Sequence, residues 1–165
     1  MTLLWQGKYL EIRKSGTWEY AARVGAMSAA VIVAITDGDE IVLVEQFRHA
    51  HGARTIELPA GLIGDTDAGD TPAAAAAREL HEETGFIAAN WQDFGAFATS
   101  PGLSSEVFQL FRATGLTRSG PGGGVDGEDI VVHVVPVANV ADFVAAQRLA
   151  GHVIDCRLII ALGLI

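Results

Sequence analysis

The segment from Thr71 to Gly85 constrains the fold of this chain more than any other, because it carries helix signals at both ends. Thr71 can accept a hydrogen bond as the N-cap, and Pro72 suits the first helical position. The alanine run 73–77 has a high helix propensity. Gly85 fits the left-handed conformation at which helices commonly stop. The sequence therefore predicts one well-bounded helix in the middle of the chain.

The same helix carries three closely spaced acids. At about 100° per residue, one stripe should pack on a sheet, namely Ala73, Ala76, Ala77 and Leu80. Glu79, Glu82 and Glu83 fall on an adjacent stripe, where they repel one another and oppose the helix dipole. Arg78 lies one turn before Glu82 and could hold it. A hard divalent cation such as Mg²⁺ would relieve the repulsion, whereas a solvated acidic face is the alternative interpretation.

The segments around this helix have the character of strands. The expected strands are 3–13, 17–24, 29–36, 41–48, 54–58, 93–99, 107–114 and 129–136, and two more helices are expected over 140–150 and 155–164. The run 29–36 is continuously apolar, as expected of a strand buried on both faces. The run 119–127 holds five glycines and is predicted to be a mobile loop. We expect a mixed α/β fold in which helices sandwich a sheet.

Composition narrows the class of protein. The chain has 165 residues, half of them hydrophobic, which suits one domain with a sizeable core. A net charge of −9 argues against general nucleic-acid binding, which needs a basic surface. Apolar runs are too short for a membrane span, and the N-terminus lacks signal-peptide features. Cys156 is the only cysteine, so we expect no intrachain disulfide and a cytoplasmic location.

The order of residues in the acidic region resembles a known motif. Gly64, Asp70 and the run from Arg78 to Phe86 follow the spacing of the Nudix box, G-x5-E-x7-R-E-U-x-E-E-x-G-U, where U is bulky and aliphatic. Asp70 replaces the family's glutamate, and Phe86 replaces the last aliphatic residue. The resemblance implies a Nudix-type α/β/α sandwich over 25–165, with a mixed sheet preceded by antiparallel strands over 1–24.

The resemblance also implies a chemistry. Members of this family hydrolyse the pyrophosphate of a nucleoside diphosphate linked to another group. They use Mg²⁺, with Mn²⁺ as a substitute, and the matching positions Glu79, Glu82 and Glu83 would be the metal ligands and catalytic residues. The segment from Glu57 to Leu62 is similar to that of ADP-ribose pyrophosphatases, in which the carbonyl at the Ala60 position also binds a metal. On that alignment Gly61, rather than Gly64, is the glycine of the box, and the sequence leaves both open.

Further positions match the same subfamily. Arg48, Glu57, Arg78 and Pro101 are expected to bind substrate, and Asp126 and Glu128 are expected to supply a late catalytic carboxylate. Each has a plainer interpretation: a strand-end charge for Arg48, an ordinary strand acid for Glu57, a turn for Pro101, and a solvated loop for the two acids.

The resemblance favours ADP-ribose as substrate, with AMP and ribose 5-phosphate as products. A nucleotide sugar of the UDP-glucose or GDP-mannose type is the alternative substrate, and a non-catalytic binding or regulatory module is the alternative class. We also expect a homodimer in which the strands of 3–24 cross to the partner and line its site. A self-contained hairpin is the alternative for these strands.

Overall fold

A computed structural model describes residues 1–64, 69–125 and 127–164 of the chain. The strands are β1 (Thr2–Gln6), β2 (Leu10–Ser15), β3 (Trp18–Arg23), β4 (Ala29–Ile35), β5 (Glu40–Arg48), β6 (Ala53–Glu57), β7 (Ala60–Leu62), β8 (Phe86–Ala98), β9 (Val107–Arg118), β10 (Val131–Pro136) and β11 (Val153–Ile154). The helices are α1 (Pro72–Thr84), α2 (Val140–Leu149) and α3 (Cys156–Ala161), with 3-10 turns η1 (Val24–Ala26) and η2 (Val137–Asn139). No helix in the described ranges is long and apolar enough to cross a membrane.

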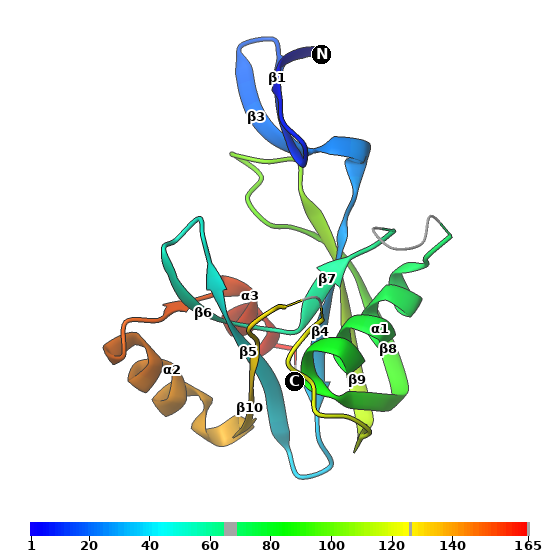
Figure 1. Cartoon of the computed structure of the whole chain (residues 1–165), viewed down its shortest axis with the longest axis vertical. Helices are drawn as coiled ribbons and strands as arrows, with labels where there is room; N and C mark the ends of the chain where they lie inside the picture. Colours follow the sequence, from blue (N-terminus) through cyan, green and yellow to red (C-terminus); the bar gives the residue numbers. More distant parts are fainter. Residues whose placement is uncertain (65–68, 126, 165) are drawn as a thin grey trace.

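The strands form two sheets. β1, β2 and β3 make a small antiparallel sheet that stands apart from the body of the molecule (Figure 1). The main sheet has the order β11-β6-β5-β4-β9-β8, with β10 paired to β5 and β7 paired to β4. β4 runs parallel to β9 and antiparallel to β5. The predicted mixed α/β fold with N-terminal antiparallel strands is therefore confirmed.

Helices cover both faces of the main sheet. α1 lies on one side, where Ala75, Ala76 and Leu80 pack against Ala30 and Ile32 of β4. α2 and α3 lie on the other side (Figure 1), and their buried residues join a second cluster with β4, β5 and β9. β4 is central to both clusters and is almost fully buried, as its continuous apolar run predicted. The predicted sandwich is confirmed, and its core flanks β4.

Several predicted boundaries differ from the structure. The single strand expected over 3–13 is two strands, because a turn closed by the Gly7 amide and the Leu10 carbonyl (2.8 Å) divides it. β8 begins at Phe86 rather than at residue 93, since all of its length pairs with β9. β7 and β11 are too short to show a local pattern and were missed.

The buried face of α1 also differs from the prediction. Ala73 and Ala77 are exposed, and the buried residues are instead Ala75, Ala76, Glu79, Leu80, Glu83 and Thr84. Alanine is small enough for either surface, so apolar character alone does not fix the rotation of an alanine-rich helix. The observed rotation turns two of the three acids, Glu79 and Glu83, inward.

The glycine-rich segment 119–124 packs on the C-terminal end of α1. The contacts run from Gly123 N to Glu83 O (2.9 Å), from Gly124 N to Glu82 O (3.0 Å) and from Ser119 N to Gly85 O (2.8 Å). They satisfy carbonyls that lack partners within the helix. This segment is irregular, as predicted, but its backbone is hydrogen-bonded to the helix that carries the acids, which the prediction of a mobile loop did not anticipate.

Candidate active site

A pocket of about 880 Å³ opens beside β7 and the C-terminal half of α1. Among the predicted site residues, those that line it are Arg48, Glu57, Ala60, Glu79, Glu83 and Glu128. They come from four separate elements and one loop segment, so the fold brings together positions that are far apart in the sequence. The pocket gathers acidic side chains on α1 and basic side chains on β5 and α3.

Glu83 is a deeply buried acid of the pocket, with an exposed fraction of 4%. Its Oε2 accepts a hydrogen bond from the Ala60 amide of β7 (3.0 Å). The pKa of Glu83 is raised from 4.5 to about 8, mainly by burial and also by the charges of Glu79, Glu128 and Glu57, while the Ala60 amide opposes the change. A buried carboxylate among other carboxylates is a place where a cation would be strongly favoured.

Arg78 organises the outer side of the acidic cluster. Its Nη1 donates to Glu79 (2.7 Å) and to Glu82 (3.2 Å), and its Nη2 donates to the Leu62 carbonyl (3.3 Å). Nη2 also lies 3.4 Å from a carboxylate oxygen of Asp70. The predicted contact with Glu82 is confirmed. Asp70, with its shorter side chain, therefore still reaches the arginine of the motif.

Gly61 lies directly under Glu79. A Cβ added at Gly61 would lie 1.9 Å from the Glu79 carboxyl carbon, a distance that no two nonbonded atoms can share. Glu79 therefore occupies the space that any other residue at position 61 would fill. The structure gives Gly61 this close contact with a carboxylate of the motif, which supports the alignment with Gly61 as the glycine of the box.

Glu57 is held between two arginines at the other end of the pocket. Arg48 donates to it through Nε and Nη2, both at 2.7 Å, and Arg157 Nη2 lies 3.5 Å from its Oε2. Thr55 also donates to the same carboxylate through its hydroxyl. Arg157 is itself paired with Asp155, from Nε to Oδ2 at 2.6 Å. Glu57 and Arg48 thus form a fixed pair rather than two separate charges.

The late acidic loop contributes one described residue to the pocket. Glu128 is exposed, lines the pocket, and accepts a hydrogen bond from the Val125 amide through Oε2 (3.2 Å). Its charge acts on Glu83. Asp126 lies outside the described residues. Of the two loop acids predicted to be catalytic, Glu128 is therefore the one whose position can be related to the helix.

Three of the predicted residues that the structure describes do not line the pocket, namely Arg78, Glu82 and Pro101. Glu82 is partly buried and accepts a hydrogen bond from Arg78, and the Arg78 side chain contacts acids rather than the cavity. Pro101 lies in an exposed turn before β9. Sequence reasoning also missed four charged residues that do line the pocket, namely Arg23, Glu106, Asp155 and Arg157. Asp155 had a local signal, because it is the N-cap of α3, and Arg157 follows two residues later.

The donor set fits a hard cation. Glu79 and Glu83 are buried carboxylates facing one pocket, Glu82 lies one residue away, and Ala60 adds backbone atoms at the same place. Oxygen donors of this kind suit Mg²⁺ or Mn²⁺. Among the described residues, no group of three or more His, Cys, Asp or Glu side chains is already arranged to hold a metal ion. Arg78 and the Ala60 amide donate hydrogen bonds to the carboxylates of α1.

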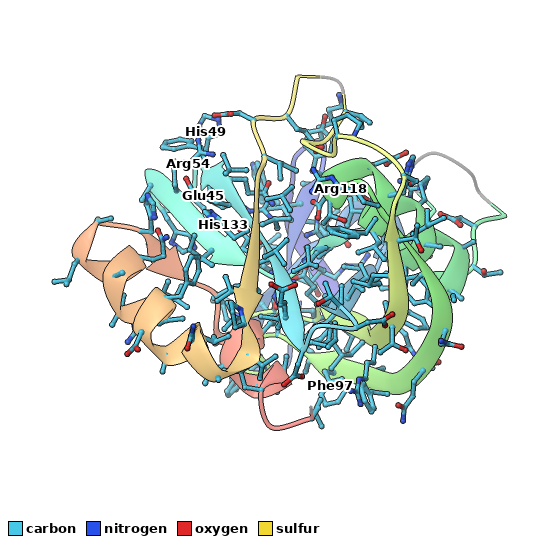
Figure 2. All side chains as sticks on the ribbon, turned by 90° about the horizontal axis from the view of Figure 1, so that it is seen from below. Glu45, His49, Arg54, Phe97, Arg118 and His133 are labelled. Carbon is cyan, nitrogen blue, oxygen red and sulfur yellow. The ribbon has the colours of Figure 1, made fainter. Side chains whose placement is uncertain are left out.

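A second charged network lies on the opposite face of β5 and β6. Glu45 is paired with Ile56, whereas Glu57 is paired with Val44, so the two glutamates project to opposite faces. Glu45 accepts hydrogen bonds from Arg54 and contacts His133 at 2.9 Å (Figure 2). Arg54 also binds the Asp129 carboxylate (2.7 Å) and the Asp129 carbonyl (3.0 Å). This network fixes the backbone that follows Glu128.

Comparison with known proteins identifies the fold and the family. The NUDIX domain model matches residues 26–151. An ADP-ribose pyrophosphatase of Mycobacterium tuberculosis is 41% identical over 129 residues, which cover 77% of this chain and 59% of that protein. A GDP-mannose pyrophosphatase of an Enterobacter species is 30% identical over 142 residues, which cover 81% of this chain and 70% of that protein.

A solved structure has the same architecture. The crystal structure of an ADP compounds hydrolase superposes with a TM-score of 0.67 at 22% identity, covering 87% of this chain and 82% of that one. The chain spans less than two thirds of the length of the Mycobacterium relative. Because the domain model matches well over half of the residues and includes the acidic helix and its flanking strands, the chain belongs to the Nudix family.

Proposed function

We propose that this protein hydrolyses the pyrophosphate of a nucleoside diphosphate derivative, with ADP-ribose as the substrate and AMP and ribose 5-phosphate as products. The observation that carries the proposal is the pair of buried carboxylates, Glu79 and Glu83, facing a pocket whose other end holds Arg48. Family membership and the ADP-ribose pyrophosphatase of Mycobacterium tuberculosis support it.

Glu79, Glu82, Glu83 and the Ala60 carbonyl would hold Mg²⁺ or Mn²⁺. Such ions neutralise phosphate oxygens and lower the pKa of bound water. Glu83 is oriented for this role by the Ala60 amide, and Glu79 is oriented by Arg78. Arg48 would bind a phosphate oxygen at the other end of the pocket, and its pairing with Glu57 would hold the guanidinium in place.

The reaction forms one P–O bond, breaks another and transfers one proton. The oxygen of a water molecule bonds to one phosphorus, the bridging oxygen leaves with the other phosphate, and a carboxylate accepts the proton of the water. Glu128 and Asp126 of the loop are the candidates for that carboxylate, with a helix glutamate as the alternative. Glu128 lies at the pocket with an exposed side chain, so water can reach it.

The first test is the Glu83→Gln variant. Because Gln keeps the shape but loses the charge, we expect turnover of ADP-ribose to fall by roughly a hundredfold or more, with an unchanged circular dichroism spectrum. Phosphate release after phosphatase treatment measures the rate. Asp37→Asn is the control, since Asp37 is exposed in the turn between β4 and β5 and does not line the pocket. Normal turnover in Glu83→Gln would remove the helix carboxylates from the mechanism.

The same assay separates the alternatives. Full rates in both Asp126→Asn and Glu128→Gln would place the proton acceptor elsewhere. A panel of ADP-ribose, UDP-glucose and GDP-mannose would identify the preferred substrate, and the similarity to a GDP-mannose pyrophosphatase is the reason to include the last. Absence of magnesium-dependent hydrolysis of every member would favour the binding or regulatory module.

We further propose that residues 1–24 act in a homodimer, in which they cross to the partner and line its site, while 25–165 form the Nudix domain proper. The small sheet leaves large apolar side chains exposed, including Leu3, Leu4, Trp5, Tyr9 and Trp18. Such a patch on a free surface favours association. Size-exclusion chromatography with light scattering tests this. A particle of 17.3 kDa, the mass of one chain, would contradict it.

A further inference from the structure

Arg157 occupies the pocket in a way that the sequence did not predict. It is the second residue of α3 and lines the same cavity as Arg48, Glu57 and Glu83. Its side chain is 21% exposed, so it is neither free in solvent nor sealed in the core. A guanidinium in this position needs an explanation beyond surface charge.

The orientation of Arg157 is set without any ligand. Its backbone amide donates to Asp155 Oδ1 (2.8 Å), and its Nε donates to Asp155 Oδ2 (2.6 Å). Its guanidinium also lies 5.8 Å from the centroid of the Phe108 ring, which is within the range of a cation–π contact. Phe108 therefore contacts one face of the guanidinium, and Asp155 holds its Nε edge, before any ligand binds.

The other edge remains available. Among the contacts of the described residues, Arg157 uses Nε and Nη2 on Asp155 and Glu57, and none involves its Nη1. Arg48 has the same pattern, with Nε and Nη2 on Glu57 and none at Nη1. Two guanidiniums thus flank one carboxylate, and neither terminal Nη1 group has a protein acceptor among the described residues.

The charges around these two groups also suit an anion. Arg48 and Arg157 carry two positive charges, and Glu57 and Asp155 carry two negative charges, so this part of the pocket is neutral overall. The part next to Glu79 and Glu83 is negative and suits a cation instead. An anionic phosphate that met the cation at one end would meet hydrogen-bond donors, rather than further acids, at the other.

We propose that Arg157 is a substrate-binding residue that donates, together with Arg48, to the phosphate oxygens of the substrate that the metal ion does not bind. The proposal deepens the proposed function, on which it rests, and it adds a residue from α3 to the site. The competing explanation is that Arg157 only ties α3 to β6 through Glu57. The two explanations differ in what happens to the affinity for a diphosphate.

The test is calorimetric titration of the full chain with ADP in the presence of magnesium. We expect Arg157→Gln to raise the Kd by roughly tenfold, because it removes charged hydrogen bonds to phosphate. Arg157→Lys keeps the charge and should recover part of the affinity. Arg148→Gln, on the exposed side of α2, is the matched control and should bind ADP as the wild type does.

The result that would overturn the proposal is a Kd within twofold of the wild type in both Arg157 variants, whatever their melting temperatures. Failure of the wild type to bind ADP would also overturn it. If Arg157→Gln does not fold, Arg157→Lys decides alone: an affinity equal to that of the wild type contradicts a contact through the fixed guanidinium, and a threefold or larger loss supports it.

Steady-state kinetics with ADP-ribose separate this inference from the proposed function. We expect Arg157→Gln to raise KM roughly tenfold with little change in kcat, since uniform binding is lost. If the wild type hydrolyses ADP-ribose and Arg157→Gln changes neither KM nor the affinity for ADP, only the inference fails. If the wild type hydrolyses nothing, yet ADP binding depends on Arg157, only the proposed hydrolysis fails.

Discussion

Two buried glutamates of this protein have opposite surroundings. Glu45 on β5 is 9% exposed, and Glu83 on α1 is 4% exposed, so both lose most of their contact with water. Glu45 is surrounded by cations and donors, with Arg54 and His133 in contact and His152 Nε2 at 4.0 Å. Glu83 has one neutral hydrogen-bond donor, the Ala60 amide, and the acids Glu79, Glu128 and Glu57 raise its pKa, although the charge of Arg48 also acts on it.

The pKa values follow from this difference. Burial pushes the pKa of Glu45 upward, but hydrogen bonds from His133 and Arg54 outweigh it, and the pKa is lowered overall. Burial pushes the pKa of Glu83 upward as well, and there the neighbouring carboxylates add to the effect, which brings the pKa to about 8. Burial of a carboxylate is therefore no guide to its role until its partners are known.

The two glutamates contribute differently to the stability of the fold. The Glu45 network completes its own charge balance within the chain and holds β5, β6 and β10 together with the backbone at Asp129. The Glu83 cluster is left incomplete, as expected of a site that a ligand completes. Substitutions at the two glutamates should then change stability in opposite directions.

The largest expected effect is on the metal-free stability of Glu83→Gln. The carboxyl pKa is 4.5 in the unfolded chain and about 8 in the folded chain, so the folded state retains a proton that the unfolded state releases between these values. Wild-type stability is therefore lost as pH rises through that window. Glutamine cannot ionise, so the variant should be more stable, by roughly 1.4 kcal/mol for each pKa unit.

Urea unfolding in EDTA at about pH 5, 7 and 9 measures this difference. The advantage of Glu83→Gln should be small at the lowest pH and should grow to several kcal/mol at the highest. A difference that stays constant with pH would mean that Glu83 is compensated in the folded protein and that the contrast with Glu45 is wrong. Magnesium should reduce the advantage, because it stabilises the wild type.

The next effect is a loss of stability in Glu45→Gln. The substitution leaves Arg54 without its charged partner, and we expect a loss of about 2 kcal/mol near neutral pH, below the range for breaking a fully buried pair because Arg54 is 26% exposed. The pKa of Glu45 is lowered, so this contribution exists above 4.5 and disappears as the pH falls through the folded-state value.

Urea unfolding over the same pH range tests it, with Glu19→Gln as an exposed control on β3. Glu45→Gln and the Glu19→Gln control should have equal stabilities at acidic pH, and Glu45→Gln should be the less stable of the two at neutral pH. Equal stabilities of Glu45→Gln and the wild type at neutral pH would show that the histidines and Arg54 do not depend on this carboxylate.

The sequence predicted the parts of the molecule that local signals specify. Thr71 and Gly85 bound α1 as expected, and Thr71 accepts the hydrogen bond from the Ala74 amide that an N-cap should accept. The acids of α1 were found because their spacing in a helix is regular. Glu57 and Arg48 were found through similarity to a family segment, and the structure pairs them with each other.

What the sequence did not predict depends on contacts between distant residues. Arg157 lies one hundred residues from Glu57, and neither residue carries a local mark of the other. The predicted rotation of α1 was wrong because five alanines leave the buried face undecided, so that docking on β4 and β7 determines it. β7 itself has three residues, too few for a pattern. Sites assembled from several elements therefore emerge only with the tertiary structure.

The smallest expected effect concerns Glu79, which is intermediate between the two glutamates because it is buried and yet paired with Arg78. In Gly61→Ala the new Cβ would lie 1.9 Å from the Glu79 carboxyl carbon, so the flexible carboxylate must move aside. We expect kcat/KM for ADP-ribose to fall roughly tenfold, since displaced ligands support the reaction poorly, while stability changes by about 1 kcal/mol or less. Gly38→Ala is the control, because its added Cβ meets only ordinary contacts, the nearest at 3.5 Å. Equal activity of Gly61→Ala and Gly38→Ala, measured at saturating magnesium, would mean that Glu79 can shift without consequence and that Glu83 alone carries the contrast with Glu45.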